Sequence, residues 1–127
     1  MSHHAVIRID QAHALVLQLD SHPPLARRLE AHRHPTRRHA SAARTGHEFL
    51  AEVCAAVDDV DEILVVGGHQ ALADFEHYVR KHRPETAARI VGNDVVDQLS
   101  QSQLAAHARR FFERRAHLAD IGALPGG

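Results

Sequence analysis

The feature that most constrains the fold is an uninterrupted apolar run at residues 63–66, which ends in the glycine pair Gly67 and Gly68. Such a run is typical of a strand covered on both faces, within a sheet that carries helices. The run is far too short to span a membrane. We therefore expect a buried central strand over residues 62–68 and a tight glycine turn into the helix that follows.

Two segments near the start of the chain place apolar residues at every second position, on one face of a strand: Ala5, Ile7 and Ile9 in the first and Leu15, Leu17 and Leu19 in the second. They are residues 4–10 and 13–20, and only a short turn separates them. This pattern predicts an antiparallel hairpin in which Asp10 is a turn residue that hydrogen-bonds nearby backbone. Two prolines then end the second strand. The next segment, 26–32, suits a helix by propensity and a short third strand by spacing, so its residues alone leave the choice open.

The rest of the chain alternates helical and strand patterns. A helix is expected from Thr45, whose hydroxyl caps it, with Glu48 completing a capping box. After the central strand, we expect a helix through about Lys81, a helical turn from Pro84, a strand over 88–93 and a final helix capped by Ser100.

Strands that alternate with helices imply parallel crossovers, so the chain is expected to be a mixed α/β domain. An antiparallel hairpin would lead into parallel strands, with helices packed on the sheet. At 127 residues the chain fits one domain, residues 1–127, with a frayed tail at 119–127.

Three stretches resemble the middle domain of the release-factor and Pelota group. They are the opening hairpin AVIRIDQAHALVLQLD, the unit HEFLAEVCAAVDDVDEILVVGGHQALADFEHYV, and the end RIVGNDVVDQLSQSQLAAHARRFF. The last is similar to stand-alone bacterial proteins described as translational machinery. The resemblance covers roughly residues 4–113. It implies a ribonuclease-H-like fold, a third strand at 26–32, and a translation-related factor with rRNA, tRNA or the ribosome as partner.

The catalytic tripeptide of release factors is missing. In that group a GGQ sequence lies on the loop between the early strands and the first long helix, and it drives hydrolysis of peptidyl-tRNA. Residues 32–46 take that place here and contain no GGQ, while the sequence GGHQ at 67–70 follows the central strand. Leu72 replaces a lysine that is common in the bacterial relatives. We therefore expect a non-catalytic factor, without catalytic residues or a cofactor.

A basic segment offers the main candidate site. Residues 32–46 lack apolar periodicity and are expected to be a mobile loop. Across 27–44, Glu30 is the single acid beside six arginines, whose guanidinium groups pair well with phosphates. The predicted RNA-binding residues are Arg27, Arg28, Arg33, Arg37, Arg38 and Arg44. The alternative is a solvated loop that binds nothing. No aromatic residue interleaves the loop, so base stacking is not expected.

Two other functions stay open. A metal-dependent nuclease would need several carboxylates that converge at one place, with Asp10, Glu62, Asp94 and Asp97 as candidates. A homo-oligomeric interaction protein, such as a homodimer, would use the His-rich loop to bind a metal or a partner. Its weak candidate ligands are His32, His34, His39 and His47. Because structural zinc sites usually include cysteines and this loop has none, no metal site is predicted.

Cys54 is the only cysteine, so no intrachain disulfide can form. Its place in an apolar helical stripe predicts a buried thiol. The opening residues have no basic start followed by a long apolar run, so no signal peptide is expected and the predicted location is the cytoplasm.

Overall fold

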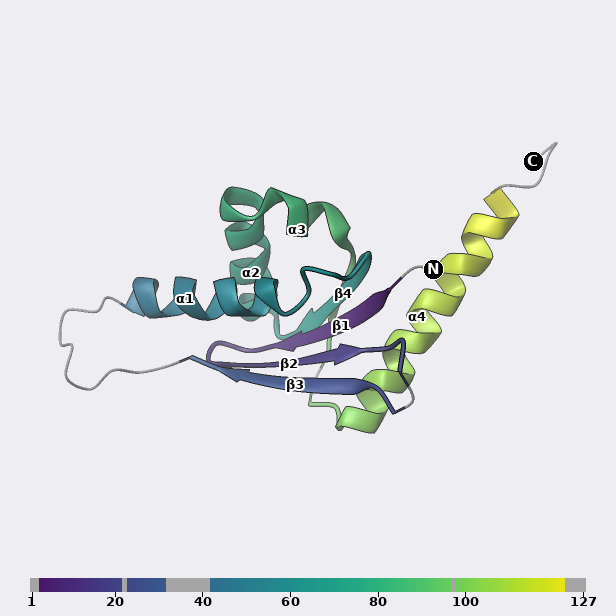
Figure 1. The fold of residues 1–127 in the computed structure, drawn as a ribbon, viewed down its shortest axis with the longest axis horizontal. Coiled ribbons are helices and arrows are strands. Elements are labelled where there is room, and N and C mark those ends of the chain that lie inside the picture. The colour runs from purple at the N-terminus through teal and green to yellow at the C-terminus, as the bar shows by residue number, and fades with distance from the viewer. Residues whose placement is uncertain (1–2, 22, 32–41, 97, 123–127) are drawn as a thin grey trace.

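The computed structural model describes residues 3–21, 23–31, 42–96 and 98–122 (Figure 1). The elements in chain order are β1 (His4–Ile9), β2 (His13–Gln18), β3 (Leu25–Glu30), α1 (Ala42–Ala55), β4 (Glu62–Gly67), α2 (His69–His82), α3 (Pro84–Arg89), β5 (Ile90–Val95) and α4 (Gln101–Gly122). Within these ranges, no helix is both long and apolar enough to cross a membrane.

The strands form one mixed sheet in the order β3-β2-β1-β4-β5. β2 pairs antiparallel with both β1 and β3, whereas β4 pairs parallel with both β1 and β5. The predicted fold class, an antiparallel hairpin that leads into parallel strands with packed helices, is confirmed. The segment that the residues left undecided is the strand β3. Figure 1 shows α1, α2 and α3 together on one side of the sheet and α4 on the other.

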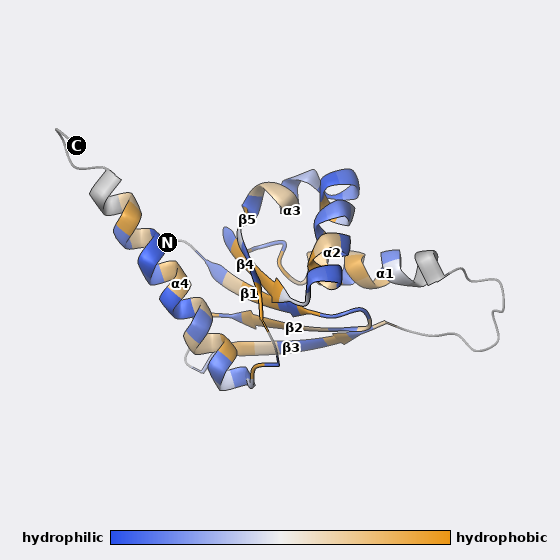
Figure 2. Ribbon diagram, turned by 180° about the vertical axis from the view of Figure 1, so that it is seen from behind, coloured by the Kyte–Doolittle hydropathy of each residue, from blue (hydrophilic) through white to orange (hydrophobic). Residues whose placement is uncertain are grey.

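The inner strands β1, β2 and β4 are largely buried on both faces of the sheet, to which successive side chains of a strand point in turn. On the face under α1 and α2, Ile7 and Val65 pack in one cluster with Phe75. On the face under α4, Leu64 packs in a second cluster with Leu104. Figure 2 shows hydrophobic residues along the inner strands between these layers. The apolar run at 63–66 is fully buried, which confirms a strand covered on both faces.

Two of the predicted turn and cap residues, Asp10 and Ser100, make the expected hydrogen bonds. The Asp10 Oδ1 atom accepts bonds from the backbone N–H groups of Ala12 and His13, at 2.8 and 2.7 Å. The Ser100 hydroxyl accepts from the Gln103 N–H at 3.1 Å, and the Gln103 side chain accepts from the Ser100 N–H at 2.9 Å. This reciprocal pair is a capping box at the start of α4.

Several boundaries differ from the predictions. α1 begins at Ala42 rather than at Thr45, so its start overlaps the segment predicted as a loop. Alanine is the strongest helix former, and two alanines precede Arg44, so the helix starts ahead of the expected cap. β5 starts two residues late, because residues 88–89 complete α3. α4 continues to Gly122 within the predicted tail. The predicted loop at 32–41 and the tail at 123–127 lie outside the described residues.

Cys54 is buried on α1, as predicted, with no exposed surface. Burial raises the pKa of its thiol above the ordinary value of 9.0, and the weaker effects of Arg83 and a hydrogen bond with Thr86 act in the opposite direction. The thiol is therefore neutral and shielded, and its place among apolar side chains matches a structural cysteine.

The buried thiol gives a chemical prediction. Because the thiolate is the reactive form, we expect iodoacetamide at about pH 8 to leave Cys54 of the folded protein unmodified and to alkylate it rapidly in urea. Mass spectrometry measures both rates. The unfolded chain loses the thiol proton first, so the contribution of this group to stability falls as pH rises above about 9. Equal alkylation rates in the folded and unfolded protein would contradict burial of this side chain.

Candidate functional site

The parallel strands β1, β4 and β5 all end at the same edge of the sheet. The turns after β1 and β4 and the connection from β5 to α4 meet there. Between them lies a pocket of about 380 Å³, which we name the edge pocket. Side chains that line it include Arg8, His13, Leu15, Arg28, Glu30 and Leu99. Ligands of α/β proteins commonly bind at the carboxyl ends of parallel strands, so this pocket is a candidate site.

Two arginines flank the floor of the edge pocket. Strand register pairs Arg28 of β3 with Leu15 of β2, and Leu15 with Arg8 of β1. The three side chains therefore form a row on the α4 face, since directly paired residues point to the same side. Arg8 and Arg28 are two strands apart, which is about 10 Å between their backbones. The buried Leu15 lies between them, so both long side chains can reach the space above it.

Arg8 is half-buried, and one of its terminal N–H groups donates to the Leu99 carbonyl oxygen. Within the described residues it makes no ion pair with an acid. A guanidinium group has five N–H donors, so most of them stay available to a ligand. Sequence reasoning missed this residue, although a charge inside the apolar pattern HAVIRI was a signal.

The acids of the edge pocket lie around His13 instead of the arginines. The His13 Nδ1 atom is 3.4 Å from Asp10 Oδ1, and its Nε2 atom is 3.9 Å from Glu30 Oε1. Arg28 is exposed and makes no hydrogen bond or ion pair within the described part of the chain. Neither guanidinium group is paired with an acid of the described residues, so both can pair with a bound anion.

The glycine pair closes one side of the edge pocket. Gly67 has a φ of +157°, and a Cβ atom there would lie 2.3 Å from the carbonyl oxygen of Ile9. The Val96 N–H donates to the Gly67 carbonyl oxygen at 3.1 Å, which ties the end of β5 to this turn. Gly68 is the N-cap of α2, and its surroundings leave room for a side chain. Of these two glycines, only Gly67 stands where a larger residue would clash with the backbone.

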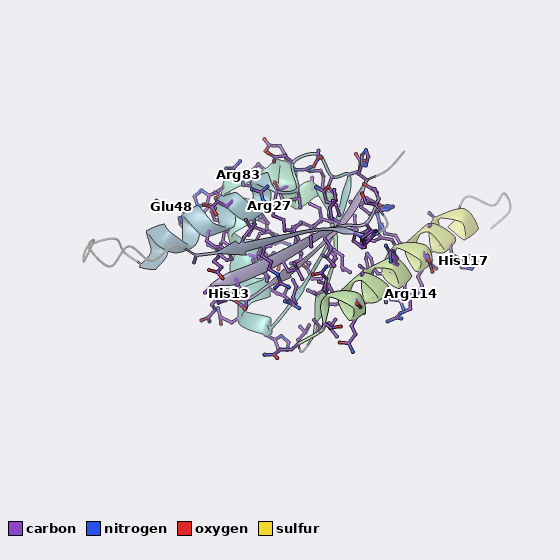
Figure 3. The ribbon with its side chains drawn as sticks, turned by 60° about the horizontal axis from the view of Figure 1, so that its bottom comes forward. His13, Arg27, Glu48, Arg83, Arg114 and His117 are labelled. Atoms are coloured by element: carbon purple, nitrogen blue, oxygen red, sulfur yellow. The ribbon has the colours of Figure 1, made fainter. Side chains whose placement is uncertain are left out.

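The structure places two of the six predicted arginines. Arg27 pairs with Val16 on the α1 side of β3, opposite to Arg28, and it is exposed without a hydrogen bond or ion pair to the described residues. Figure 3 shows Arg27 beside α1 and His13 on the other side of the strands. Arg33, Arg37 and Arg38 lie outside the described residues, and Arg44 lies in the first turn of α1, where the side chain is not described.

The predicted histidine candidates do not form a metal site in the described residues. His47, on α1, contacts the rings of Tyr78 and His82, with ring centroids 5.4 and 5.3 Å away. These rings line a second pocket of about 500 Å³ between α1 and α2. Over the described ranges, no three His, Cys, Asp or Glu side chains gather as ligands. His32, His34 and His39 lie outside those ranges.

The carboxylates considered for a nuclease do not gather with one another as metal ligands in the described residues. Glu62 begins β4, at the opposite edge of the sheet from Asp10, where it bonds the ring of His4 at 3.1 Å and the guanidinium of Arg115 at 3.0 Å. Asp94 instead bonds His107 at 3.0 Å. Asp97 is outside the described residues. The described carboxylates therefore do not converge as a two-metal site requires.

Comparison with known proteins places this geometry in a known fold. Pelota from Archaeoglobus fulgidus superposes with a TM-score of 0.58 at 18% identity, over 94% of this chain and 36% of that chain. The archaeal translation termination factor aRF1 gives a TM-score of 0.56 at 13% identity, over 95% and 42%. Pelota from Thermoplasma acidophilum gives 0.52 at 12% identity, over 80% and 30%. The likeness is one of fold.

The chain spans well under half the length of these three proteins. The expected resemblance to the release-factor and Pelota group is thus confirmed at the level of one domain's fold. No protein-family model matches the chain, and no curated protein matches it. Membership of a stand-alone bacterial family stays a prediction.

Proposed function

We propose that the protein is a non-catalytic, translation-related factor that contacts RNA or the ribosome. The contact surface is β3 together with the basic segment 32–46 that follows it. The observation that carries the proposal is the exposure of the two arginines of β3 and their lack of acid partners in the described residues. Arg27 and Arg28 project from opposite faces of an edge strand, both exposed and both without an acid partner in the described residues.

The charge along this part of the chain supports a polyanionic partner. Four more arginines follow within 33–44, while Glu30 is the only acid from residue 27 to residue 44. An overall formal charge of −1 means that this density is local and is offset elsewhere in the chain. Arginine-rich surfaces that neutralise phosphates supply most of the sequence-independent affinity for RNA.

The fold likeness supports the translation-related part of the proposal. The similar domains belong to proteins named Pelota and translation termination factor. The absence of GGQ from residues 32–46, together with the lack of a cluster of metal-ligating side chains among the described residues, supports a binding role without catalysis.

Sedimentation of cell lysate through a sucrose gradient tests the proposal. We expect the protein to co-migrate with ribosomal particles at low salt, and to move to the top after ribonuclease treatment or at moderate salt. Replacing Arg33, Arg37 and Arg38 with glutamine should abolish most of this co-migration.

A matched control removes three exposed cations elsewhere, Arg110, Arg114 and Lys81, and should co-migrate as the wild type does. A wild-type protein that stays at the top of the gradient in every condition would overturn the proposal. The proposal would also be overturned if the control variant dissociated from the particles as readily as the variant without Arg33, Arg37 and Arg38.

A further inference from the structure

We propose that the edge pocket holds a phosphate group of RNA between Arg8 and Arg28. This inference rests on the proposed function and adds to it a defined place and chemistry. It also assigns different roles to the two arginines of β3, which their charge alone does not distinguish. Arg28 contributes to a formed pocket on the α4 face, whereas Arg27 supplies only a surface charge on the other face.

The shape of the edge pocket suits a compact anionic group. Its volume of about 380 Å³ is at the small end of the range for ligand pockets. Leu15, at the floor of the pocket, is only 2% exposed, so it spaces the two arginines but offers a ligand almost no surface of its own. Arg8 and Arg28 rise on either side of this floor, from strands on each side of β2. A group bound there would meet guanidinium donors from two directions.

The hydrogen bonding of Arg8 favours a ligand that accepts several bonds. Its bond to the Leu99 carbonyl fixes the guanidinium group and leaves the other donors unused by protein acids. Holding a partly buried charge without an acid partner is costly, so an anion that completes its bonding is a physical reason for its position. Phosphate matches the planar fork of arginine and accepts paired bonds.

The nearby acids do not cancel this preference. Asp10 already accepts two backbone N–H groups of its own turn, and its other close neighbour is His13. Among the basic groups of the described residues, only His13 lies within 4.0 Å of the Glu30 carboxylate, at 3.9 Å. A carboxylate from an acidic peptide could also reach the arginines. RNA is favoured because β3 continues into a segment with four further arginines, which suits a polyanion that extends beyond the pocket.

Fluorescence anisotropy with a fluorescein-labelled single-stranded RNA oligonucleotide gives the test. We expect Arg28→Gln to weaken binding about 10-fold and to reduce the slope of log affinity against log salt by about 1. The matched control is Arg27→Gln, which removes the same charge from the adjacent exposed position on the other face. It should weaken binding no more than about 3-fold. Arg8→Lys keeps a donor for Leu99 but loses the fork, so a loss of several-fold is expected.

Each outcome bears on the inference. Equal losses for Arg28→Gln and Arg27→Gln would overturn the edge pocket and leave the proposed RNA contact in place. The edge pocket would also be overturned, and the RNA contact retained, if neither variant lost affinity while replacement of Arg33, Arg37 and Arg38 did. Competition by polyglutamate as strong as by inorganic phosphate, at equal ionic strength, would overturn the preference for phosphate. Absence of any salt-sensitive RNA binding by the wild type would instead remove the proposed function, and the inference with it.

Discussion

A Gly67→Ala variant is expected to lose about 3 kcal/mol of unfolding free energy, whereas Gly68→Ala should change it by less than about 0.5 kcal/mol. The two glycines are neighbours, and the substitution is the same. The difference comes from the backbone around them. An added Cβ at Gly67 would lie 2.3 Å from the Ile9 carbonyl oxygen, and the atom that must move is backbone of the adjacent strand.

Gly68 meets none of these restraints. Beyond its two chain neighbours, no atom of the described residues lies within 4 Å of the place that a Cβ atom of residue 68 would take, and the φ of −74° at Gly68 is accessible to any residue. Alanine would lower the entropy of the unfolded chain, which stabilises the protein slightly. Alanine is also a poorer N-cap than glycine, which offsets that gain.

Urea unfolding measures both variants, with the midpoint reporting stability and the slope reporting the surface exposed. By thermal unfolding, the loss at Gly67 corresponds to a decrease in Tm of about 10 °C. A Gly67→Ala variant as stable as the wild type would mean that β1 and β4 can separate at this turn without cost. The close approach of Gly67 to Ile9 would then not constrain the edge pocket.

The interior of the sheet was predictable because burial leaves a pattern in the residues. β1 and β2 carry apolar residues at every second position, and β4 is an apolar run, so each strand was located to within about two residues. β3 left no such pattern. Five of its six residues are exposed, and its pairing with β2 is a tertiary contact that propensity does not encode.

The candidate site was predictable only in part. Arg28 was singled out by local charge density, but that density gave no reason to separate it from Arg27. Arg8 was not singled out, because a lone charge in an alternating strand fits a solvent-facing position. Only the register, which sets Arg8 and Arg28 on either side of Leu15, brings the two guanidinium groups to one pocket. Register depends on contacts between strands, so residue patterns within one strand could not give it.

The distal half of α4 bears on the alternative of a homodimer. Figure 1 shows this part of the helix extending past the sheet, and Leu118 on it is 66% exposed. A second copy of the chain could cover this part of α4, in which case its side chains would contribute to stability. If nothing covers it, the stability that α4 contributes comes from its first half. The same substitution at two positions of the helix separates these cases.

A Leu104→Ala variant is expected to lose about 3 kcal/mol, whereas Leu118→Ala should change the unfolding free energy by less than about 0.5 kcal/mol. Leu104 is fully buried in the cluster under α4 and packs with Leu64, so its removal leaves a cavity against the sheet. Both variants change a leucine in one helix, so helix propensity cancels in the comparison. Urea unfolding at two protein concentrations measures both losses. If Leu118→Ala lost as much as Leu104→Ala, and the wild-type midpoint rose with concentration, a second copy would cover α4, because only association makes stability depend on concentration.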